Sequence, residues 1–382
     1  MNTTLVNNIK QDFLDKFNQE PLMIFSPGRI NIIGEHTDYN DGFVFPAAVN
    51  KGIIAAIGKN LGNTSTVCAS DFNDTIEFSI DSIAPMDKES WGNYVLGVIA
   101  EIQKSGKTIE NFNMVFGGDI PSGSGMSSSA ALENSVVFGL NELFNLGLTK
   151  TEMIFISQKA EHNYVGVNCG IMDQYASMFG IKNHALLLDC RSIEAKPFEI
   201  NFKNHELMLI NTNVKHSLSD SAYNDRRSVC ESISKMLNIK ALRDATEIDL
   251  QKVKDKVTPV NYQKALFVIQ ENKRAENASV AMQNGDLETL GKLIYGSHDG
   301  LQHQYKVSCV ELDFLVERAK ENKDILGARM MGGGFGGCTI NLIAKDAVEG
   351  FKTSVAKAYK NEFDKDCSIY TVELSDGTHL IK

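Results

Sequence analysis

The sequence predicts an α+β protein built from two domains. Its 382 residues exceed the usual size of one domain, so length alone favours a division into two. Hydrophobic residues make up 43% and charged residues 23%, which is normal for a globular protein with substantial cores. Strand-like and helix-like segments mix without strict alternation, which favours α+β over a doubly wound parallel sheet. We place the boundary near residue 200, giving domains 1–200 and 201–382.

The predicted strands lie mainly in the first half of the chain. They are rich in Ile, Val, Leu and Phe, and Gly or Pro punctuates several of them. They cover residues 23–34, 43–58, 111–121, 184–192 and 205–214.

Helices are predicted where apolar residues recur at helical spacing. Residues 127–147 show this spacing, with Gly147 as the expected stop, and residues 149–166 follow with Thr149 as the expected cap. The pattern is mostly helical from about 216 to 325. A glycine-rich segment and a βαβ-like stretch then complete the chain to residue 382.

Charge and cysteine usage limit the classes of function. The net charge of −10 disfavours nucleic acid or an anionic membrane as the main partner, although a small phosphate ligand needs only a local site. Residues 1–13 do not resemble a secretory signal, and the apolar stretch 52–58 is too short to span a bilayer. The seven cysteines form no CxxC pair, and the eight histidines form no HExxH motif. We therefore expect reduced thiols in a cytoplasmic protein.

The segment GRINIIGEHTDYNDG, residues 28–42, ends an apolar strand with a dense group of polar side chains. Arg29, Glu35, His36 and Asp38 are held at the mouth of a buried strand, where hydrogen-bonding groups would face a ligand. Asp38 also has an ordinary interpretation, because Asp commonly caps a turn such as the one predicted at 39–42.

A second segment, GGDIPSGSGMSSSA at 117–130, has the features of a phosphate-binding turn. Its glycines allow the backbone to approach an anion, and the serines begin a helix whose free N–H groups attract phosphate. It matches neither a Walker A loop nor a GxGxxG turn, and a serine-capped helix after a flexible turn explains it equally well.

Two further segments carry weaker signals. The run MMGGGFGGC at 330–338 suggests backbone packed against a ligand or another loop, although a tight β-turn is the simpler explanation. In residues 160–177, Glu161 lies on a predicted helix and Asp173 lies among apolar residues. Such an acid is a candidate base or metal ligand, but it is more often a structural carboxylate.

Taken together, these segments resemble the GHMP small-molecule kinases. The segment at 28–42 is similar to the sugar signature of the galactose-phosphorylating members, PSGSGMSSSAALE resembles the family's phosphate loop, and GARMMGGGFGGCTINL its third motif. CGIMDQYAS and YNDRRSVCE also look like segments of these members. The resemblance runs in the same order from residue 25 to 345. It implies an N-terminal domain like the second domain of ribosomal protein S5 and a ferredoxin-like C-terminal domain, with the active site between them.

The resemblance also implies roles for individual residues. Asp173 matches the base facing the sugar C1 hydroxyl, and Arg29 an arginine near the transferred phosphoryl group. Mg²⁺ is expected on Ser129 and Glu161. The expected sugar contacts are Glu35, His36, Thr37, Asp38, Gly170 and Tyr223, and the expected ATP contacts are Ser70, Gly123, Ser124, Gly125, Met126, Ser127, Ser128 and Ser129.

The implied reaction is ATP-dependent phosphorylation of D-galactose at C1, the first committed step of galactose use by the Leloir pathway, in a monomeric protein. This assignment fits elementary chemistry, because phosphoryl transfer needs a glycine loop, Mg²⁺ and an arginine more than covalent catalysis. A kinase for N-acetylgalactosamine or arabinose is an alternative. A non-catalytic sensor of ATP and galactose is another, although the intact phosphate loop with Arg29 and Asp173 argues against it.

Overall fold

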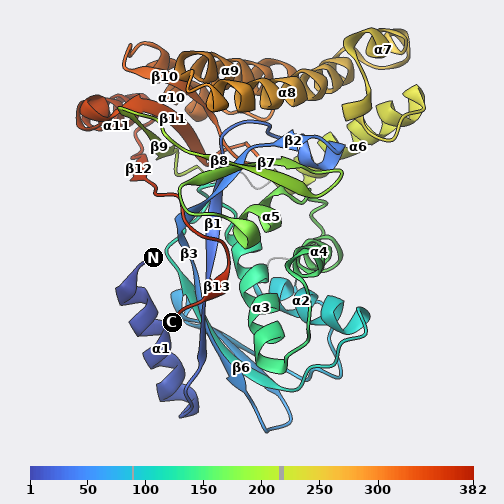
Figure 1. Ribbon diagram of the computed structural model, residues 1–382, viewed down its shortest axis with the longest axis vertical. Helices are drawn as coiled ribbons and strands as arrows, with labels where there is room; N and C mark the ends of the chain where they lie inside the picture. The colour runs from blue at the N-terminus through green and yellow to red at the C-terminus, as the bar shows by residue number, and fades with distance from the viewer. Residues whose placement is uncertain (88–89, 215–218) are drawn as a thin grey trace.

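The computed structural model describes residues 1–87, 90–214 and 219–382, and the side chains of residues 219–221 are not described. It has two parts, one above the other in Figure 1, with a three-stranded sheet between them. Strands and helices are mixed in both parts, so the predicted α+β class is confirmed. No helix among the described residues is long and apolar enough to cross a bilayer.

The lower part in Figure 1 is a six-stranded sheet in the order β13-β1-β3-β6-β4-β5. Helix α1 covers one face, and α2, α3 and α4 lie on the other side. The strands are β1 (Leu22–Asn31), β3 (Pro46–Lys59), β4 (Ser65–Ala69), β5 (Asp74–Phe78), β6 (Phe112–Gly118) and β13 (His379–Leu380). The helices are α1 (Thr3–Phe17), α2 (Gly92–Lys104), α3 (Ser128–Phe144), α4 (Lys150–Ala160) and α5 (Met172–Phe179).

The upper part contains a four-stranded sheet in the order β10-β11-β9-β12. Strands β11 and β12 both run antiparallel to β9, so with α11 they form the predicted βαβ-like unit. The strands are β9 (His205–Asn211), β10 (Ile325–Met330), β11 (Cys338–Ala344) and β12 (Ser368–Thr371). The helices are α6 (Ser219–Leu237), α7 (Glu247–Gln251), α8 (Pro259–Gln283), α9 (Leu287–Gly300), α10 (Val310–Lys320) and α11 (Val348–Phe363).

The three-stranded sheet comprises β2 (Phe43–Val44), β7 (His184–Asp189) and β8 (Glu194–Glu199). Strand β8 ends close to the boundary predicted at residue 200, and β9 then starts the upper sheet. However, β13 returns to pair with β1 in the lower sheet. The division into 1–200 and 201–382 therefore stays a proposal.

The predicted helices form with small changes at their ends. Thr149 caps α4 through a capping box, as predicted. Helix α3 ends at Phe144, where Asn145 adopts the left-handed conformation, so the predicted stop at Gly147 lies beyond the helix. Helix α4 gives way to a π-helical turn at Glu161–Val165. Helices also dominate the chain from 219 to 320, whereas positions 216–218 of the predicted helical region lie outside the described residues.

The apolar half of segment 28–42 forms part of the core between the two parts. Ile30, Ile32 and Ile33 are fully buried and belong to a cluster that includes Leu209 of β9 and Ile340 of β11. This packing anchors the end of β1 against the upper sheet. It thereby fixes the polar residues that follow, from Glu35 to Asp38.

Candidate active site

A small cavity lies at the end of β1, beside α5 and the glycine-rich loop between β10 and β11. Its volume is about 120 Å³. Eight of the predicted site residues line it together: Arg29, Glu35, His36, Asp38, Glu161, Gly170, Asp173 and Tyr223. We call it the sugar cavity, after the ligand expected there.

A second cavity, of about 340 Å³, adjoins the first. The predicted phosphate loop, residues 123–129, contributes every one of its residues to the wall. We call this the phosphate cavity. The residues common to both walls are Arg29, Val167, Asp173, Tyr223 and Gly333. The two cavities therefore meet at the side chains predicted to be catalytic.

An ion pair stands at this junction. The guanidinium of Arg29 donates to both carboxylate oxygens of Asp173, from Nε and Nη2, at 2.7 Å each. Arg29 also donates to the carbonyl of Gly125, and the hydroxyl of Ser127 donates to Asp173. Burial lowers the pKa of Arg29, but the charges of Asp173 and Glu35 outweigh it, so the pKa lies above its usual value. Arg29 is thus a fixed positive charge facing both cavities.

The carboxyl group of Asp38 is almost fully enclosed. Burial, followed by the charge of Asp173, raises the pKa of Asp38 to about 7. Gly170 makes room for it, because a Cβ atom at position 170 would lie 2.0 Å from Asp38 Oδ2. The turn after Asp38 is closed by the carbonyl of Thr37, which accepts from the N–H groups of Asn40 and Gly42. The Asp38 carboxyl also interacts with the backbone of Tyr39, so a turn-capping role stands beside the expected sugar contact.

His36 is held by tyrosines. Its Nδ1 lies 2.8 Å from the hydroxyl of Tyr39, which lies 2.7 Å from that of Tyr305. The rings of Tyr39, Tyr223 and Tyr305 pack around the imidazole. Burial, followed by the charge of Arg226, lowers the pKa of His36 to about 3. The imidazole is therefore neutral near pH 7 and presents one donor and one acceptor.

The phosphate loop has the backbone conformation that its glycines predict. Gly123 and Gly125 have positive φ, of 69° and 70°, before α3 begins at Ser128. Ser127 also has positive φ, at 57°, which is uncommon for a residue other than glycine. The hydroxyl of Ser124 is buried without a hydrogen-bond partner among the described residues. With the free N–H groups of the first helical turn, this arrangement suits an anion.

The glycines of the third motif pack against this loop. A Cβ at Gly332 would lie 3.2 Å from the carbonyl oxygen of Gly125, and one at Gly337 would lie 3.3 Å from that of Gly123. The run therefore joins β10 to β11 while keeping close contact with a second loop. Of the two interpretations offered by the sequence, packing against another loop is the one seen, because residues 331–337 form bends without a hydrogen-bonded β-turn.

Glu161 and Ser129, the predicted metal ligands, also come together. Burial raises the pKa of Glu161 to about 7, aided by the charge of Asp173, whereas interactions with Cys169, Ser129 and Gln174 oppose the shift. Glu161 opens the π-helical turn, a feature often found at functional sites. Across the described residues, no group of three or more His, Cys, Asp or Glu could hold a metal by itself. A cation here would need phosphate or water oxygens as well.

Two predicted contacts lie away from the cavities. The Thr37 hydroxyl contacts the carbonyl oxygens of Gly34 and Phe43, and the Ser70 hydroxyl donates to Asp12 of α1. Neither residue lines the sugar or phosphate cavity as the described residues form them. Their roles in binding stay predictions.

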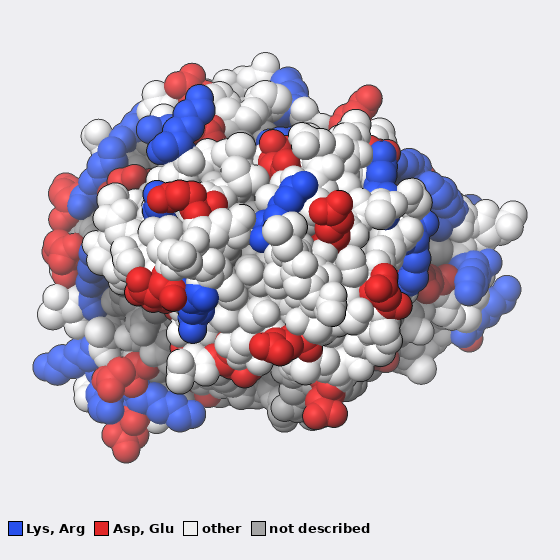
Figure 2. Space-filling model, turned by 90° about the horizontal axis from the view of Figure 1, so that it is seen from below, with Lys and Arg blue, Asp and Glu red and all other residues white. Residues whose placement is uncertain are grey.

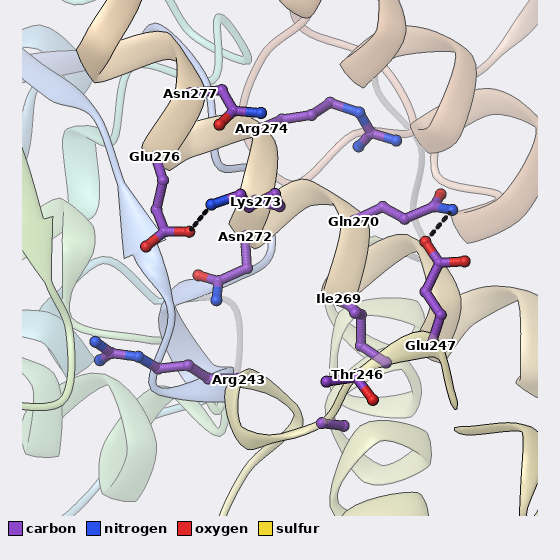
Figure 3. A pocket seen from close by; sticks show the side chains of 11 residues that line it. Arg243, Thr246, Glu247, Ile269, Gln270, Asn272, Lys273, Arg274, Glu276 and Asn277 are labelled. Carbon is purple, nitrogen blue, oxygen red and sulfur yellow. Dashed lines mark hydrogen bonds and ion pairs between the residues drawn. The ribbon is translucent and has the colours of Figure 1, made fainter. Parts of the chain in front are cut away.

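A larger cavity, of about 630 Å³, lies on α8 and contains none of the predicted site residues (Figure 3).

Sequence reasoning missed several residues that surround the site. Arg329 is fully buried and donates to Glu35 at 2.5 Å, and Glu271 of α8 accepts from the backbone beside it. The resemblance implies a contact of Ser127 with ATP alone, yet its hydroxyl also donates to Asp173. The sequence does contain an indication of Arg329, because a charged residue is unusual inside the apolar strand before the third motif. It contains no indication of Glu271, because acidic residues are common on helices.

Comparison with known proteins defines the class. Models of the GHMP kinase N-terminal and C-terminal domains match residues 93–181 and 278–361. The mevalonate kinase of Methanococcus jannaschii, at 16% identity, shares the fold with a TM-score of 0.65 over 94% of this chain and 99% of its own. The two domain models therefore place this chain among the GHMP kinases, and its fold agrees.

The segment expected to bind the sugar, together with relatives similar over nearly the whole chain, identifies the family within that class. A model of the galactokinase galactose-binding signature matches residues 11–59. Galactokinases of Clostridium acetobutylicum and Thermotoga petrophila are each 40% identical, covering 99% and 94% of this chain and 99% and 100% of their own. A crystal structure of Lactococcus lactis galactokinase complexed with galactose gives a TM-score of 0.95 at 34% identity, covering 98% of this chain and 100% of that one. The chain belongs to the galactokinase family.

Proposed function

We propose that this chain transfers the γ-phosphoryl group of ATP to the C1 hydroxyl of D-galactose, giving galactose 1-phosphate and ADP. Membership of the galactokinase family supports the activity and the sugar. The observation that carries the proposal is the Arg29–Asp173 pair, which stands where the sugar cavity meets the phosphate cavity. A sugar hydroxyl in the first cavity and a phosphoryl group in the second would meet beside this pair, because both residues line both cavities.

In this proposal, Asp173 accepts or orients the proton of the attacking hydroxyl. The two bonds from Arg29 fix the plane of its carboxylate. Arg29 also places a buried positive charge beside the phosphoryl group, where negative charge is spread over oxygens during transfer. Positioning and charge thus come from one rigid pair.

Sugar recognition rests on Glu35, His36 and Asp38. The carboxyl groups of Glu35 and Asp38 can accept hydrogen bonds from sugar hydroxyls, and the neutral imidazole of His36 can donate one and accept one. A site that hydrogen-bonds a hydroxyl rejects the epimer in which that hydroxyl points elsewhere, because a buried polar group is left unpaired. We assign Asp38 to the C4 end of the ring, where galactose and glucose differ.

The phosphate loop and the Ser129–Glu161 pair form the proposed MgATP site. The loop supplies backbone N–H groups and the Ser124 hydroxyl to the phosphates. Mg²⁺ prefers oxygen ligands and commonly takes one or two from protein and the rest from phosphate and water. One hydroxyl and one buried carboxylate fit that requirement. When bound, the ion would neutralise phosphate charge.

Release of ADP across a panel of sugars tests the proposal. We expect turnover with D-galactose and at least about tenfold lower kcat/KM with D-glucose, because an unsatisfied buried polar group costs roughly 1–3 kcal/mol. Faster turnover of N-acetylgalactosamine or arabinose would transfer the assignment to a related sugar kinase. Binding of galactose and ATP without any ADP release would instead support a sensor.

We also propose a monomer in the cytoplasm. All seven cysteines are free thiols, as expected in a reducing compartment. On the face shown in Figure 2, acidic and basic side chains are interspersed, which gives a nucleic acid no continuous basic surface on that face. Light scattering of the purified protein would measure its mass, and a dimer would contradict the proposal.

A further inference from the structure

The loop that carries Glu35 and Asp38 is held from behind by α8. Glu271 of this helix is fully buried. Its Oε1 atom accepts from the N–H groups of Gly34 and Glu35, at 3.0 and 3.3 Å, and from the Ser297 hydroxyl at 2.6 Å. Arg274 donates to its other oxygen at 2.5 Å. A single carboxylate thus fixes the backbone where the sugar-binding residues begin.

The next residue of α8 holds the far end of the same loop. Asn272 Oδ1 accepts from the N–H group of Phe43 at 2.8 Å. Figure 3 shows Asn272 and Arg274, two residues apart on this helix, among the residues that line the large surface cavity. Helix α8 therefore supports both ends of the loop 34–43 from outside the sugar cavity.

Arg329 of β10 holds the side chain of Glu35. It is fully buried, and its Nη1 donates to Glu35 Oε2 and to the Met330 carbonyl at 2.5 and 2.6 Å. Its remaining donors bond the carbonyls of Asn31 and Ile32, the latter at 2.9 Å. A planar guanidinium with several satisfied donors has one fixed orientation. The carboxylate of Glu35 is fixed with it, leaving Oε1 as the atom that can accept from a sugar hydroxyl.

We propose that Glu271 and Arg329 are positioning residues of the sugar cavity, which together fix the backbone and the carboxylate of Glu35 for galactose. The inference rests on the proposed function, because it assigns these residues to sugar binding. It does not give them contact with sugar, since neither lines the sugar cavity as the described residues form it. Both come from the part of the chain after residue 200, so sugar affinity depends on how that part packs against the end of β1.

The test measures KM for galactose and for ATP separately, together with the melting temperature. Glu271→Gln replaces an acceptor with an amide that presents N–H groups to donors, and we expect a galactose KM at least about tenfold higher. KM for ATP should stay within about twofold. The control is Glu276→Gln on the same helix, at a side chain 43% exposed whose ion pair with Lys273 lies outside the sugar cavity. It should leave both constants unchanged.

A second pair of variants tests Arg329. Arg329→Met should raise the galactose KM as strongly as Glu271→Gln does. Arg329→Lys should raise it less, because Lys keeps the charge without the planar fork. Should Arg329→Met fail to fold, Glu35→Gln combined with Arg329→Lys decides. Under positioning, the double variant loses no more galactose affinity than Glu35→Gln alone, because Arg329 acts through the Glu35 side chain.

Two different failures can be told apart. If the unsubstituted protein releases ADP with galactose but the Glu271 and Arg329 variants keep its galactose KM, the positioning inference is wrong and the proposed function stands. A loss of melting temperature with equal changes in both KM values would mean a structural role only, and would also overturn the inference. If the unsubstituted protein does not phosphorylate galactose, the proposed function itself fails.

Discussion

Replacing Gly170 by alanine tests the geometry of the sugar cavity at a single atom. The new Cβ would lie 2.0 Å from Oδ2 and 2.1 Å from Cγ of Asp38, whereas real Cβ contacts stay above 3.0 Å. The carboxylate must therefore move by about 1 Å (3.0 minus 2.0). The backbone at Gly170 is not in the left-handed region, so alanine adds no strain of its own.

The displacement should be visible as weaker galactose binding. At a pH above the Asp38 pKa of about 7, where the carboxyl is ionised, a shift of 1 Å removes a hydrogen bond to a charged acceptor, which contributes about 1.5–3 kcal/mol. The galactose KM should rise by roughly 10- to 150-fold. KM for ATP should change little, because Gly170 does not line the phosphate cavity.

The assay is ADP release at varied galactose, with melting temperature measured in parallel. Gly350→Ala in α11 is the matched control, since a Cβ there meets nothing within 4 Å. It should keep the galactose KM and gain about 0.5–1 kcal/mol of stability. A Gly170→Ala protein with the original galactose KM would refute the assignment of Asp38 to the sugar.

Three further predictions concern the carboxylates. Asp173→Asn should lower kcat by about 10²–10⁴-fold while calorimetry shows nearly unchanged galactose binding, and near-normal turnover would make Asp173 structural. Glu161→Gln should raise the Mg²⁺ concentration needed for half-maximal turnover, and an unchanged requirement would exclude it as a ligand. In the sugar-free protein, the pKa of Asp38 is about 7, raised from 3.8 mainly by burial. Between about pH 4 and 7 the folded state keeps a proton that the unfolded chain has lost, so the free energy of unfolding falls as pH rises. Asp38→Asn should show a shallower fall in denaturant titrations, and an identical slope would contradict the shift.

The sequence predicted the parts of the fold that have strong local patterns. The strands at β1, β3, β6 and β9 and the helices α3 and α4 follow from apolar runs, helical spacing and the Thr149 cap. Helix α1 and the hairpin of β4 and β5 were not predicted, because polar residues weaken their patterns. The return of β13 to β1 is a contact between the two ends of the chain, which no local pattern can indicate.

The candidate site likewise contains residues that the sequence predicts and residues that it does not. Side chains that touch the expected ligands lie in short motifs, so the resemblance located them, and the structure gathers most of them around two cavities. Glu271 and Arg329 act on other side chains and on backbone groups, and their partners lie far away in the sequence. The altered pKa values of His36 and Asp38 likewise depend on burial and on charges brought near by folding.

The position of the new phosphate on the sugar tests the central claim most directly. If the reacting hydroxyl meets the Arg29–Asp173 pair as proposed, the product of galactose and MgATP is a 1-phosphate. Two-dimensional ³¹P–¹H NMR of the reaction mixture should then correlate the new phosphorus with the anomeric proton of galactose. Correlation with the protons at C6, or the appearance of inorganic phosphate without a sugar phosphate, would contradict the account.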